Sequence, residues 1–182
     1  MPRWLNIPNS FTLLRLFLVP FVIQSILSGR HFTALALFAA AAATDLLDGA
    51  AARHFGSSTQ AGAYLDPIAD KCLLSGVFLA LAAASILPWW FVAIIFGRDL
   101  YILLAVAAIM LLTPVRRFPP SVWGKLSTFV QIVTAVSWMA RDVLPYRVLD
   151  LFSSAMLWPC VGFTVWSGLH YTWRGIQLAR AH

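Results

Sequence analysis

Long apolar stretches separated by short polar connectors dominate this chain. Six of them approach the roughly 20 residues that a helix needs to cross a bilayer, namely residues 11–27, 32–47, 70–86, 89–112, 122–139 and 149–176. Pro20 and Pro159 fall inside two of these stretches, and membrane helices tolerate proline. The connectors contain helix breakers such as Gly29, Pro88 and Pro145. The pattern predicts an all-α membrane protein with six transmembrane helices.

Composition agrees with a membrane protein and excludes an ordinary soluble domain. Of 182 residues, 60 % are hydrophobic and 11 % are charged, whereas soluble domains carry roughly a quarter charged residues. The length fits one domain, residues 1–182. The net charge is +6, and all seven acids are aspartates. With this hydropathy, the basic excess favours an anionic membrane face, and we expect no nucleic-acid partner.

The distribution of cations predicts the orientation in the membrane, because cytoplasmic loops are enriched in Lys and Arg. With six spans, one side holds both termini and two loops, which carry Arg3, Arg53, Arg116, Arg117, Lys125, Arg174 and Arg180. The other side carries Arg30, Arg141 and Arg147. We therefore expect both termini in the cytoplasm. Cys72 and Cys160 lie in apolar runs without a metal-type spacing, and we expect both thiols to be buried.

Four of the seven aspartates lie within 26 residues, at Asp45, Asp48, Asp66 and Asp70. The first pair is spaced i, i+3 at the end of the second span, and the second pair is spaced i, i+4 at the start of the third. Either spacing puts two carboxylates on one helix face. A helical hairpin would bring the two pairs together at the cytoplasmic rim.

Four carboxylates at a membrane boundary repel one another and lose hydration, so a cation should hold them. Hard oxygen ligands suit Mg²⁺, Mn²⁺ or Ca²⁺, and four of them can bind the pair of metals common at phosphate-transfer sites. The alternative is a set of solvated charges at helix ends. It is disfavoured because such charges would not be confined to one hairpin in so acid-poor a chain.

Small and basic residues lie between the two pairs. Gly49 and Ala52 leave room for a ligand to approach the backbone, and Arg53 offers a fork suited to phosphate. The structural alternatives are a helix-packing role for Gly49 and an ordinary cation at the membrane rim for Arg53.

The complete string runs from Asp45 to Asp70 and reads D-x-x-D-G-x-x-A-R, eight residues, then G-x-x-x-D-x-x-x-D. It resembles the signature of the CDP-alcohol phosphatidyltransferases at every fixed position, with Gly62 as its second glycine. The segments Asn6–Arg15 and Gly124–Gln131 also resemble the first and fifth spans of the branches that form phosphatidylglycerophosphate and cardiolipin. The resemblance covers about residues 5 to 135.

This resemblance implies a fold, a reaction and a set of site residues. Six helices would surround a polar cavity open to the cytoplasm. Asp45, Asp48, Asp66 and Asp70 would bind two Mg²⁺ or Mn²⁺ ions, and Asp70 would also act as the general base. The enzyme would transfer the phosphatidyl group of CDP-diacylglycerol to an alcohol and release CMP. Gly49, Ala52, Arg53 and Gly62 would line the CDP pocket.

The acceptor depends on cations outside the signature. Arg98 lies inside the fourth span, where a charged residue is a functional candidate, and with Lys125 it would bind the phosphate of glycerol 3-phosphate. That assignment predicts a phosphatidylglycerophosphate synthase. The alternative is a cardiolipin synthase with phosphatidylglycerol as acceptor, because Arg98-Asp99 resembles the Arg-Asp pair often found in that branch. If Arg98 has no binding role, its charge is paired with Asp99 or its N–H groups are hydrogen-bonded to neighbouring residues.

Arg15 is a second cation within an apolar run. It would bind lipid phosphate, cap the carboxylate cluster or serve helix packing, and the sequence does not separate these roles. Because Arg15 interrupts the first run and no Ala-x-Ala site follows, we interpret the run as a span rather than a signal peptide.

Two other function classes were weighed. A transporter would place its carboxylates near the bilayer centre rather than at one rim, and would not need Gly49, Ala52, Arg53 and Gly62. A non-catalytic scaffold is disfavoured because all four aspartates are intact. We expect an enzyme of the bacterial inner membrane with its active site facing the cytoplasm, and a homodimer is the common form in the family that the chain resembles.

Overall fold

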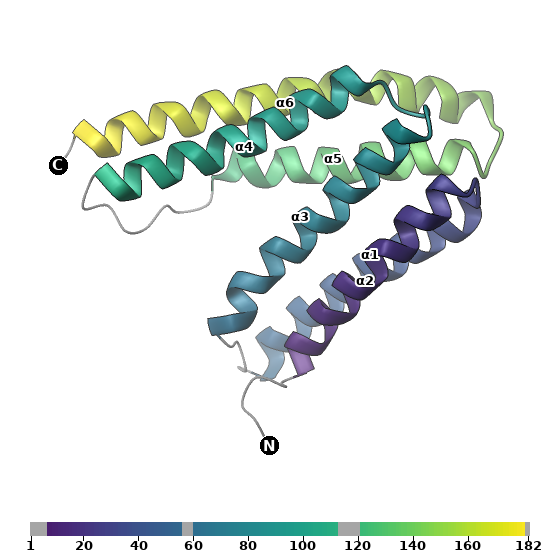
Figure 1. Ribbon diagram of the computed structural model, residues 1–182, viewed down its shortest axis with the longest axis horizontal. Coiled ribbons are helices and arrows are strands. Elements are labelled where there is room, and N and C mark those ends of the chain that lie inside the picture. The colour runs from purple at the N-terminus through teal and green to yellow at the C-terminus, as the bar shows by residue number, and fades with distance from the viewer. Residues whose placement is uncertain (1–6, 56–59, 113–120, 181–182) are drawn as a thin grey trace. The chain divides into compact units, whose positions relative to one another are not determined.

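The computed structural model describes residues 7–55, 60–112 and 121–180; within these ranges, the side chains of residues 7–12, 45–55, 60–68, 106–110, 112, 176 and 178–180 lie outside the description. The described residues form six α-helices and no strand (Figure 1), which confirms the all-helical prediction. These helices are α1 (Ile7–Leu27), α2 (His31–Phe55), α3 (Gln60–Ala83), α4 (Trp89–Leu112), α5 (Val122–Arg141) and α6 (Arg147–Arg180).

The helices match the apolar stretches but extend beyond them at polar ends. The second apolar stretch ends near residue 47, whereas α2 continues to Phe55, and α3 begins at Gln60, ten residues before Asp70. Hydrophobic residues mark the part of a helix that contacts lipid or the protein core. They do not mark the helix ends, because polar residues also adopt helical conformation.

Two helices end at residues with left-handed backbone conformation. Gly29 has φ 69°, and the N–H of Arg30 donates to the carbonyl of Ser25 at 2.9 Å. Ser85 has φ 59°, and the N–H of Ile86 donates to the carbonyl of Leu81 at 2.9 Å. Both are Schellman-type ends, which satisfy the last carbonyls of a helix. Ser85 explains why α3 stops at Ala83, short of the predicted end at residue 86.

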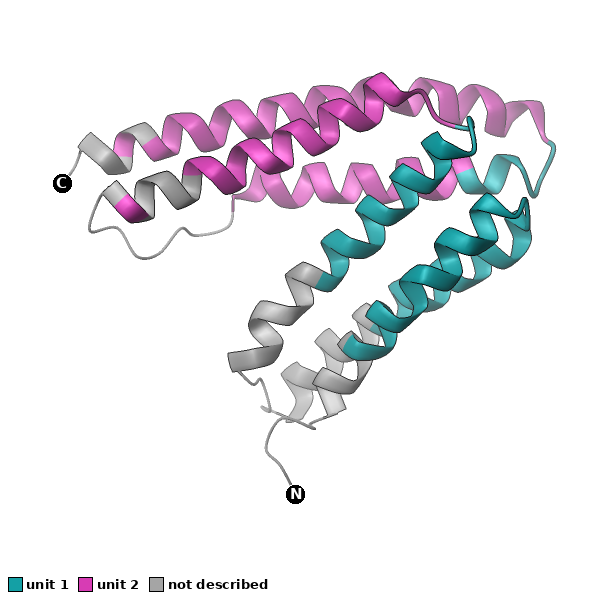
Figure 2. Cartoon of the chain, in the orientation of Figure 1, with its two compact units in different colours: residues 1–86, 139–145 teal, residues 87–138, 146–182 magenta. Residues whose placement is uncertain are grey.

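The chain divides into two compact units (Figure 2), residues 1–86 with 139–145 and residues 87–138 with 146–182. In unit 1, α1 packs against both α2 and α3. Its described core contains Val22, Phe38, Val77 and Phe78, each at most 2 % exposed. A Cβ built on Gly76 of α3 would lie 2.9 Å from Ile23 Cδ1 of α1. The absence of a side chain at Gly76 therefore allows these two helices to approach closely.

In unit 2, α4 packs against α6, and side chains join α5 to α6. The indole N–H of Trp138 donates to the carbonyl of Ser153 at 2.9 Å. Phe91 and Cys160 are fully buried. These contacts supply the frame that positions Arg98 on α4 and Lys125 on α5.

Large apolar side chains are exposed on several helices, as expected of a surface that meets lipid. Phe17 is 63 % exposed, Leu103 65 % and Trp158 72 %. Among the described residues, one helical stretch, Arg147–Gly175, is long and apolar enough by itself to cross a membrane, and shorter apolar stretches occupy Leu13–Leu27 and His31–Thr44. The prediction of six spans therefore stays a prediction.

One cysteine prediction is wrong. Cys160 is buried as expected, but Cys72 is exposed on α3. The packed face of α3 is formed by neighbours such as Leu73, Val77 and Phe78, and Cys72 points away from it. In a chain whose outer surface is also apolar, an apolar run does not distinguish buried positions from exposed ones.

Candidate active site

The predicted aspartates lie on the two helices that the sequence assigned to them. Asp45 and Asp48 belong to the C-terminal part of α2, and Asp66 and Asp70 belong to the N-terminal part of α3. Seven of the predicted site residues have side chains outside the described residues: Asp45, Asp48, Gly49, Ala52, Arg53, Gly62 and Asp66. Their roles stay predictions, as does the gathering of the four carboxylates.

Asp70 is the acidic member whose side chain is described, and it pairs with Arg15. The Nη1 of Arg15 donates to Oδ1 of Asp70, across the contact between α1 and α3. The Arg15 side chain is fully buried, whereas the Asp70 side chain is 46 % exposed. Asp70 thus lies against a buried cation while nearly half of its own side chain is exposed. The contact joins Arg15 to one of the four aspartates, and the capping of a carboxylate cluster by Arg15 stays a prediction.

Arg98 of α4 is held on several sides within unit 2. Its Nη1 donates to Oδ1 of Asp99 at 2.8 Å, and its Nη2 donates to the hydroxyl of Ser167 on α6. Its guanidinium carbon lies 5.9 Å from the centroid of the Tyr171 ring, within cation–π range. Arg98 therefore does pair with Asp99, which is what the sequence predicts if Arg98 has no ligand-binding role. However, these two hydrogen bonds use only two of the five N–H groups of Arg98. Its Nε has no hydrogen-bond partner among the described residues.

The start of α5 lies against Tyr171 as well. The backbone N–H of Ser121 donates to the Tyr171 hydroxyl at 3.1 Å. The Ser121 hydroxyl accepts from the N–H of Trp123 at 3.2 Å, so Ser121 caps the helix. A Cβ on Gly124 would lie 3.2 Å from the Tyr171 hydroxyl. Lys125, the other predicted acceptor residue, is exposed in this first turn.

Buried polar side chains continue along the contact between α5 and α6. The amide nitrogen of Gln131 donates to Oγ1 of Thr164 at 3.3 Å and to the hydroxyl of Ser127 at 3.5 Å. All three residues are at most 1 % exposed. Hydrogen bonds of this kind join membrane helices. They account structurally for Gln131, which belongs to the fifth-span segment singled out in the sequence.

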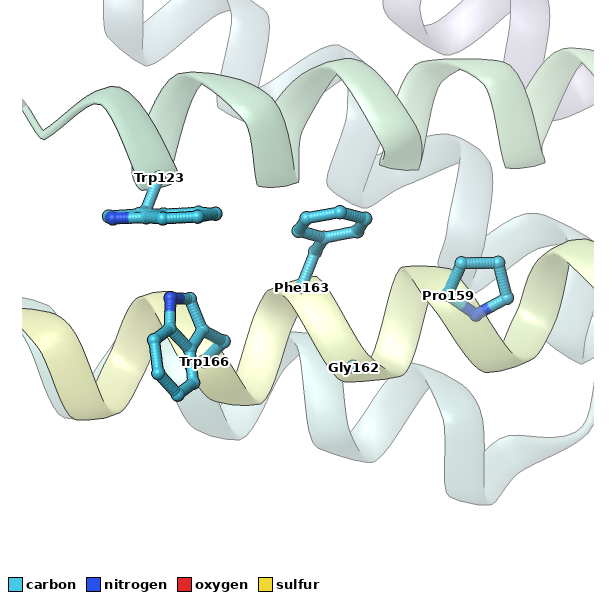
Figure 3. Close-up of a pocket in the computed structure, with 5 residues that line it drawn as sticks. All are labelled: Trp123, Pro159, Gly162, Phe163 and Trp166. Carbon is cyan, nitrogen blue, oxygen red and sulfur yellow. The ribbon is translucent and has the colours of Figure 1, made fainter.

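The same two helices also form an apolar groove. Trp123 of α5 and Phe163 of α6 project into the space between the helices, and Trp166 lies along α6 with one edge toward Trp123 (Figure 3). With Pro159 and Gly162 they enclose about 330 Å³. The two indoles meet edge to face, with centroids 5.9 Å apart. None of the five residues is charged, so the groove offers no cation to a phosphate.

The sequence as a whole is similar to one family of phospholipid-synthesising enzymes. The family model of the CDP-alcohol phosphatidyltransferases matches residues 5–166. The chain belongs to this family. The predicted family and the predicted enzyme class are confirmed.

Individual members of the family show the same relationship over most of the chain. The chain is 35 % identical over 184 residues to the probable phosphatidylglycerophosphate synthase of Mycobacterium tuberculosis, covering 96 % of this chain and 84 % of that protein. It is 34 % identical over 192 residues to the CDP-diacylglycerol–glycerol-3-phosphate 3-phosphatidyltransferase of Bacillus subtilis, covering 91 % and 93 %. It is 31 % identical over 195 residues to the CMP-forming cardiolipin synthase of Rattus norvegicus, covering 96 % and 64 %.

The geometry adds residues to the site that sequence reasoning did not list. The sequence leaves the role of Arg15 open, because its contact with Asp70 appears only in the fold. The sequence does not single out Tyr171, Ser167 or Ser121. Their signal is weak, because Ser and Tyr occur widely in membrane helices, and Tyr171 lies beyond the end of the family match at residue 166.

Proposed function

We propose that this phosphatidyltransferase transfers the phosphatidyl group of CDP-diacylglycerol to glycerol 3-phosphate and releases CMP. The relatives from M. tuberculosis and B. subtilis carry names for this activity. The observation that carries the choice of acceptor is Arg98, a cation buried to all but 11 % of its side chain and fixed by Asp99 and Ser167. A fixed guanidinium fork suits a phosphate group.

The four aspartates fit a pair of Mg²⁺ or Mn²⁺ ions. Asp45, Asp48, Asp66 and Asp70 supply only hard carboxylate oxygens, the donors that these ions prefer. The partial exposure of the Asp70 side chain is compatible with a ligand there. When bound, the ions would offset the negative charge of the diphosphate.

The remaining residues divide between the donor and the acceptor. Gly49, Ala52, Arg53 and Gly62 would line the CDP pocket. Asp70 would accept the proton of the acceptor hydroxyl, whose oxygen attacks the phosphorus nearest the diacylglycerol. The bond from that phosphorus to the bridging oxygen breaks, and CMP leaves with the electron pair. Arg15 would hold the Asp70 carboxylate, and Arg98 and Lys125 would bind the acceptor phosphate.

We also propose that residues 1–182 form one catalytic domain of six membrane-spanning helices around a polar cavity open to the cytoplasm. The exposed apolar side chains of α1, α4 and α6 and the uneven distribution of Arg and Lys support this topology. The bacterial relatives support a place in the inner membrane. A homodimer stays a prediction.

Cardiolipin synthesis, with phosphatidylglycerol as acceptor, is the second candidate. It is favoured by the Arg98-Asp99 pair and by the similarity to the rat cardiolipin synthase. Both acceptors offer a hydroxyl, but glycerol 3-phosphate also carries a dianionic phosphomonoester, whereas the phosphate of phosphatidylglycerol is a monoanionic phosphodiester.

The decisive experiment is an acceptor panel. The purified protein in detergent micelles receives labelled CDP-diacylglycerol, Mg²⁺ or Mn²⁺, and either glycerol 3-phosphate, phosphatidylglycerol, inositol phosphate or serine. We expect CMP release with glycerol 3-phosphate and loss of release in excess EDTA. Release only with phosphatidylglycerol would select the second candidate, and full activity in EDTA would contradict the metal site.

A further inference from the structure

Tyr171 contacts two of the three helices of unit 2 from its place on the third. Its ring faces the guanidinium of Arg98 on α4 at 5.9 Å. Its hydroxyl accepts the backbone N–H of Ser121, directly before α5, at 3.1 Å. One α6 side chain thus contacts both segments from which the predicted acceptor residues come.

The approach of Tyr171 to α5 is close and depends on Gly124. A Cβ at Gly124 would lie 3.2 Å from both Oη and Cε2 of Tyr171, closer than ordinary van der Waals contact. A second α6 side chain reaches the same place, because Nδ1 of His170 lies 3.2 Å from the Ser121 hydroxyl. The backbone N–H of Lys125 in turn donates to the carbonyl of Ser121 at 3.2 Å. The turn that carries Lys125 is therefore tied to α6 through Ser121.

The ring of Tyr171 also restricts Arg98. Asp99 and Ser167 each bind one end of the guanidinium, and its carbon lies over the Tyr171 ring, 5.9 Å from the centroid. An arginine fixed in this way loses little conformational freedom when it binds an anion, which favours affinity. The contacts arise from residues 167–171, beyond the part of the chain that the family model matches.

We propose that Tyr171 is a positioning residue of the acceptor site. Its ring orients Arg98, and its hydroxyl fixes the first turn of α5 with Lys125, so that both cations serve one phosphomonoester. This role rests on the proposed function, in which glycerol 3-phosphate is the acceptor. Tyr171 itself does not act on the reacting atoms.

The test separates the two contacts of Tyr171. Tyr171→Phe removes the hydroxyl and keeps the ring, whereas Tyr171→Leu removes both. Tyr101→Phe is the matched control, because the Tyr101 hydroxyl also joins α4 to α6, through Oγ1 of Thr172 at 2.7 Å, and no contact with Arg98 is involved. Initial rates of CMP release are measured with glycerol 3-phosphate and CDP-diacylglycerol varied separately, together with the melting temperature of each variant in detergent.

We expect Tyr171→Phe to raise the KM for glycerol 3-phosphate about 2- to 10-fold, the effect of one lost hydrogen bond. Tyr171→Leu should raise it by a further factor of about 3 to 30 through loss of the cation–π contact. The KM for CDP-diacylglycerol should not change in either variant, and Tyr101→Phe should resemble the wild type in both constants. A purely structural role would instead lower the melting temperature and the rate without separating the two KM values.

Two results would overturn the proposal, and they are distinguishable. If the wild type uses glycerol 3-phosphate but Tyr171→Leu keeps its acceptor KM, or Tyr101→Phe raises it equally, Tyr171 has no positioning role and the proposed function stands. If the wild type releases CMP only with phosphatidylglycerol, the proposed function fails in the wild type itself, and the phosphomonoester role of Tyr171 fails with it.

Discussion

The buried guanidinium of Arg15 forms an ion pair with the carboxylate of Asp70, 55 positions further along the chain. A fully buried arginine needs an anionic partner, because its charge loses the hydration it has in water. Asp70 supplies that partner and keeps nearly half of its own side chain exposed. The pair therefore links the packing of α1 against α3 to the chemistry expected of the proposed general base.

Replacing Arg15 tests this link. Arg15→Met keeps much of the side-chain volume but leaves Asp70 without its cation, so we expect a lower kcat and a lower melting temperature. Arg15→Lys keeps the charge and should recover part of both. Breaking a buried pair costs about 3–5 kcal/mol, and the exposure of Asp70 reduces that figure. The kcat loss should be smaller than that of Asp70→Asn, because the base itself remains.

Arg30→Met is the matched control, since Arg30 belongs to unit 1 and is exposed. The same loss of positive charge there should leave kcat and the melting temperature close to the wild type. Equal activity of Arg15→Met and Arg30→Met would show that Arg15 does not support Asp70. An effect on melting temperature with unchanged kcat would assign Arg15 to packing alone.

Most helices of this chain are predictable from the sequence because each corresponds to a long apolar run, and several runs begin or end at a proline or glycine. The limits of α4 follow directly from Pro88 and the apolar run 89–112. The polar ends of α2 and α3 do not follow, because hydrophobicity does not distinguish a solvated helix from a loop. The exposure of Cys72 is not predictable either, since lipid and protein core select the same residue types.

In the candidate site, too, some residues are predictable from the sequence and others are not. The aspartates were identifiable because an exact spacing of acids in an acid-poor chain has few structural explanations. The partners of Arg98 were only half identifiable: Asp99 is its neighbour in the sequence, whereas Ser167 and Tyr171 lie about 70 residues away and reach it only through the packing of α4 against α6. Long-range contacts of common residue types leave no local pattern.

The contact between α1 and α3 can be tested at Gly76. A Cβ there would lie 2.9 Å from Ile23 Cδ1, the mobile end of a long side chain, so Gly76→Ala should be tolerated with a small shift. Gly76→Leu should force the helices apart at an overpacking cost of about 1–3 kcal/mol, and should lower kcat by disturbing the Arg15–Asp70 pair. Thermal unfolding in detergent and CMP release measure the two effects.

Gly162→Leu provides the comparison for Gly76→Leu. Gly162 is also helical, and a Cβ there meets nothing within 4 Å. Both substitutions add the same side chain to a helix glycine, so the difference in melting temperature reports the local space alone. Equal stability of the two leucine variants would contradict the close approach at Gly76.

The proposed orientation predicts which loops are accessible from each side of the membrane. In a variant with Cys72 and Cys160 replaced by alanine, a cysteine at Ser28, in the exposed turn after α1, should react with an impermeant maleimide added to intact cells. A cysteine at Ser57 should react only after the membrane is opened. The reverse pattern would place the Arg53 segment outside the cell, away from its cytoplasmic nucleotide substrate.

The division between donor and acceptor residues predicts two different kinetic defects. Asp70→Asn keeps the size of the side chain but removes a base and a metal ligand. Loss of a general base typically lowers the rate by ~10²–10⁴-fold, so kcat should fall at least that far. CDP-diacylglycerol should still bind in part, because Asp45, Asp48, Asp66 and Arg53 remain. Binding of labelled CDP-diacylglycerol to the inactive variant measures this directly.

Arg98→Ala should produce the opposite pattern. Truncating one partner of a buried charge pair costs on the order of 2–5 kcal/mol, and each 1.4 kcal/mol is a factor of ten, so the KM for glycerol 3-phosphate should rise by about 30-fold or more. The KM for CDP-diacylglycerol should stay near the wild-type value, since Arg98 is assigned to the acceptor alone.

Arg98→Lys is the control for this variant, because Arg98→Ala also leaves Asp99 without this partner. Arg98→Lys should recover part of the affinity for glycerol 3-phosphate. A rise in the donor KM with an unchanged acceptor KM would remove Arg98 from the acceptor site, and phosphatidylglycerol, which carries no phosphomonoester, would then be the better acceptor.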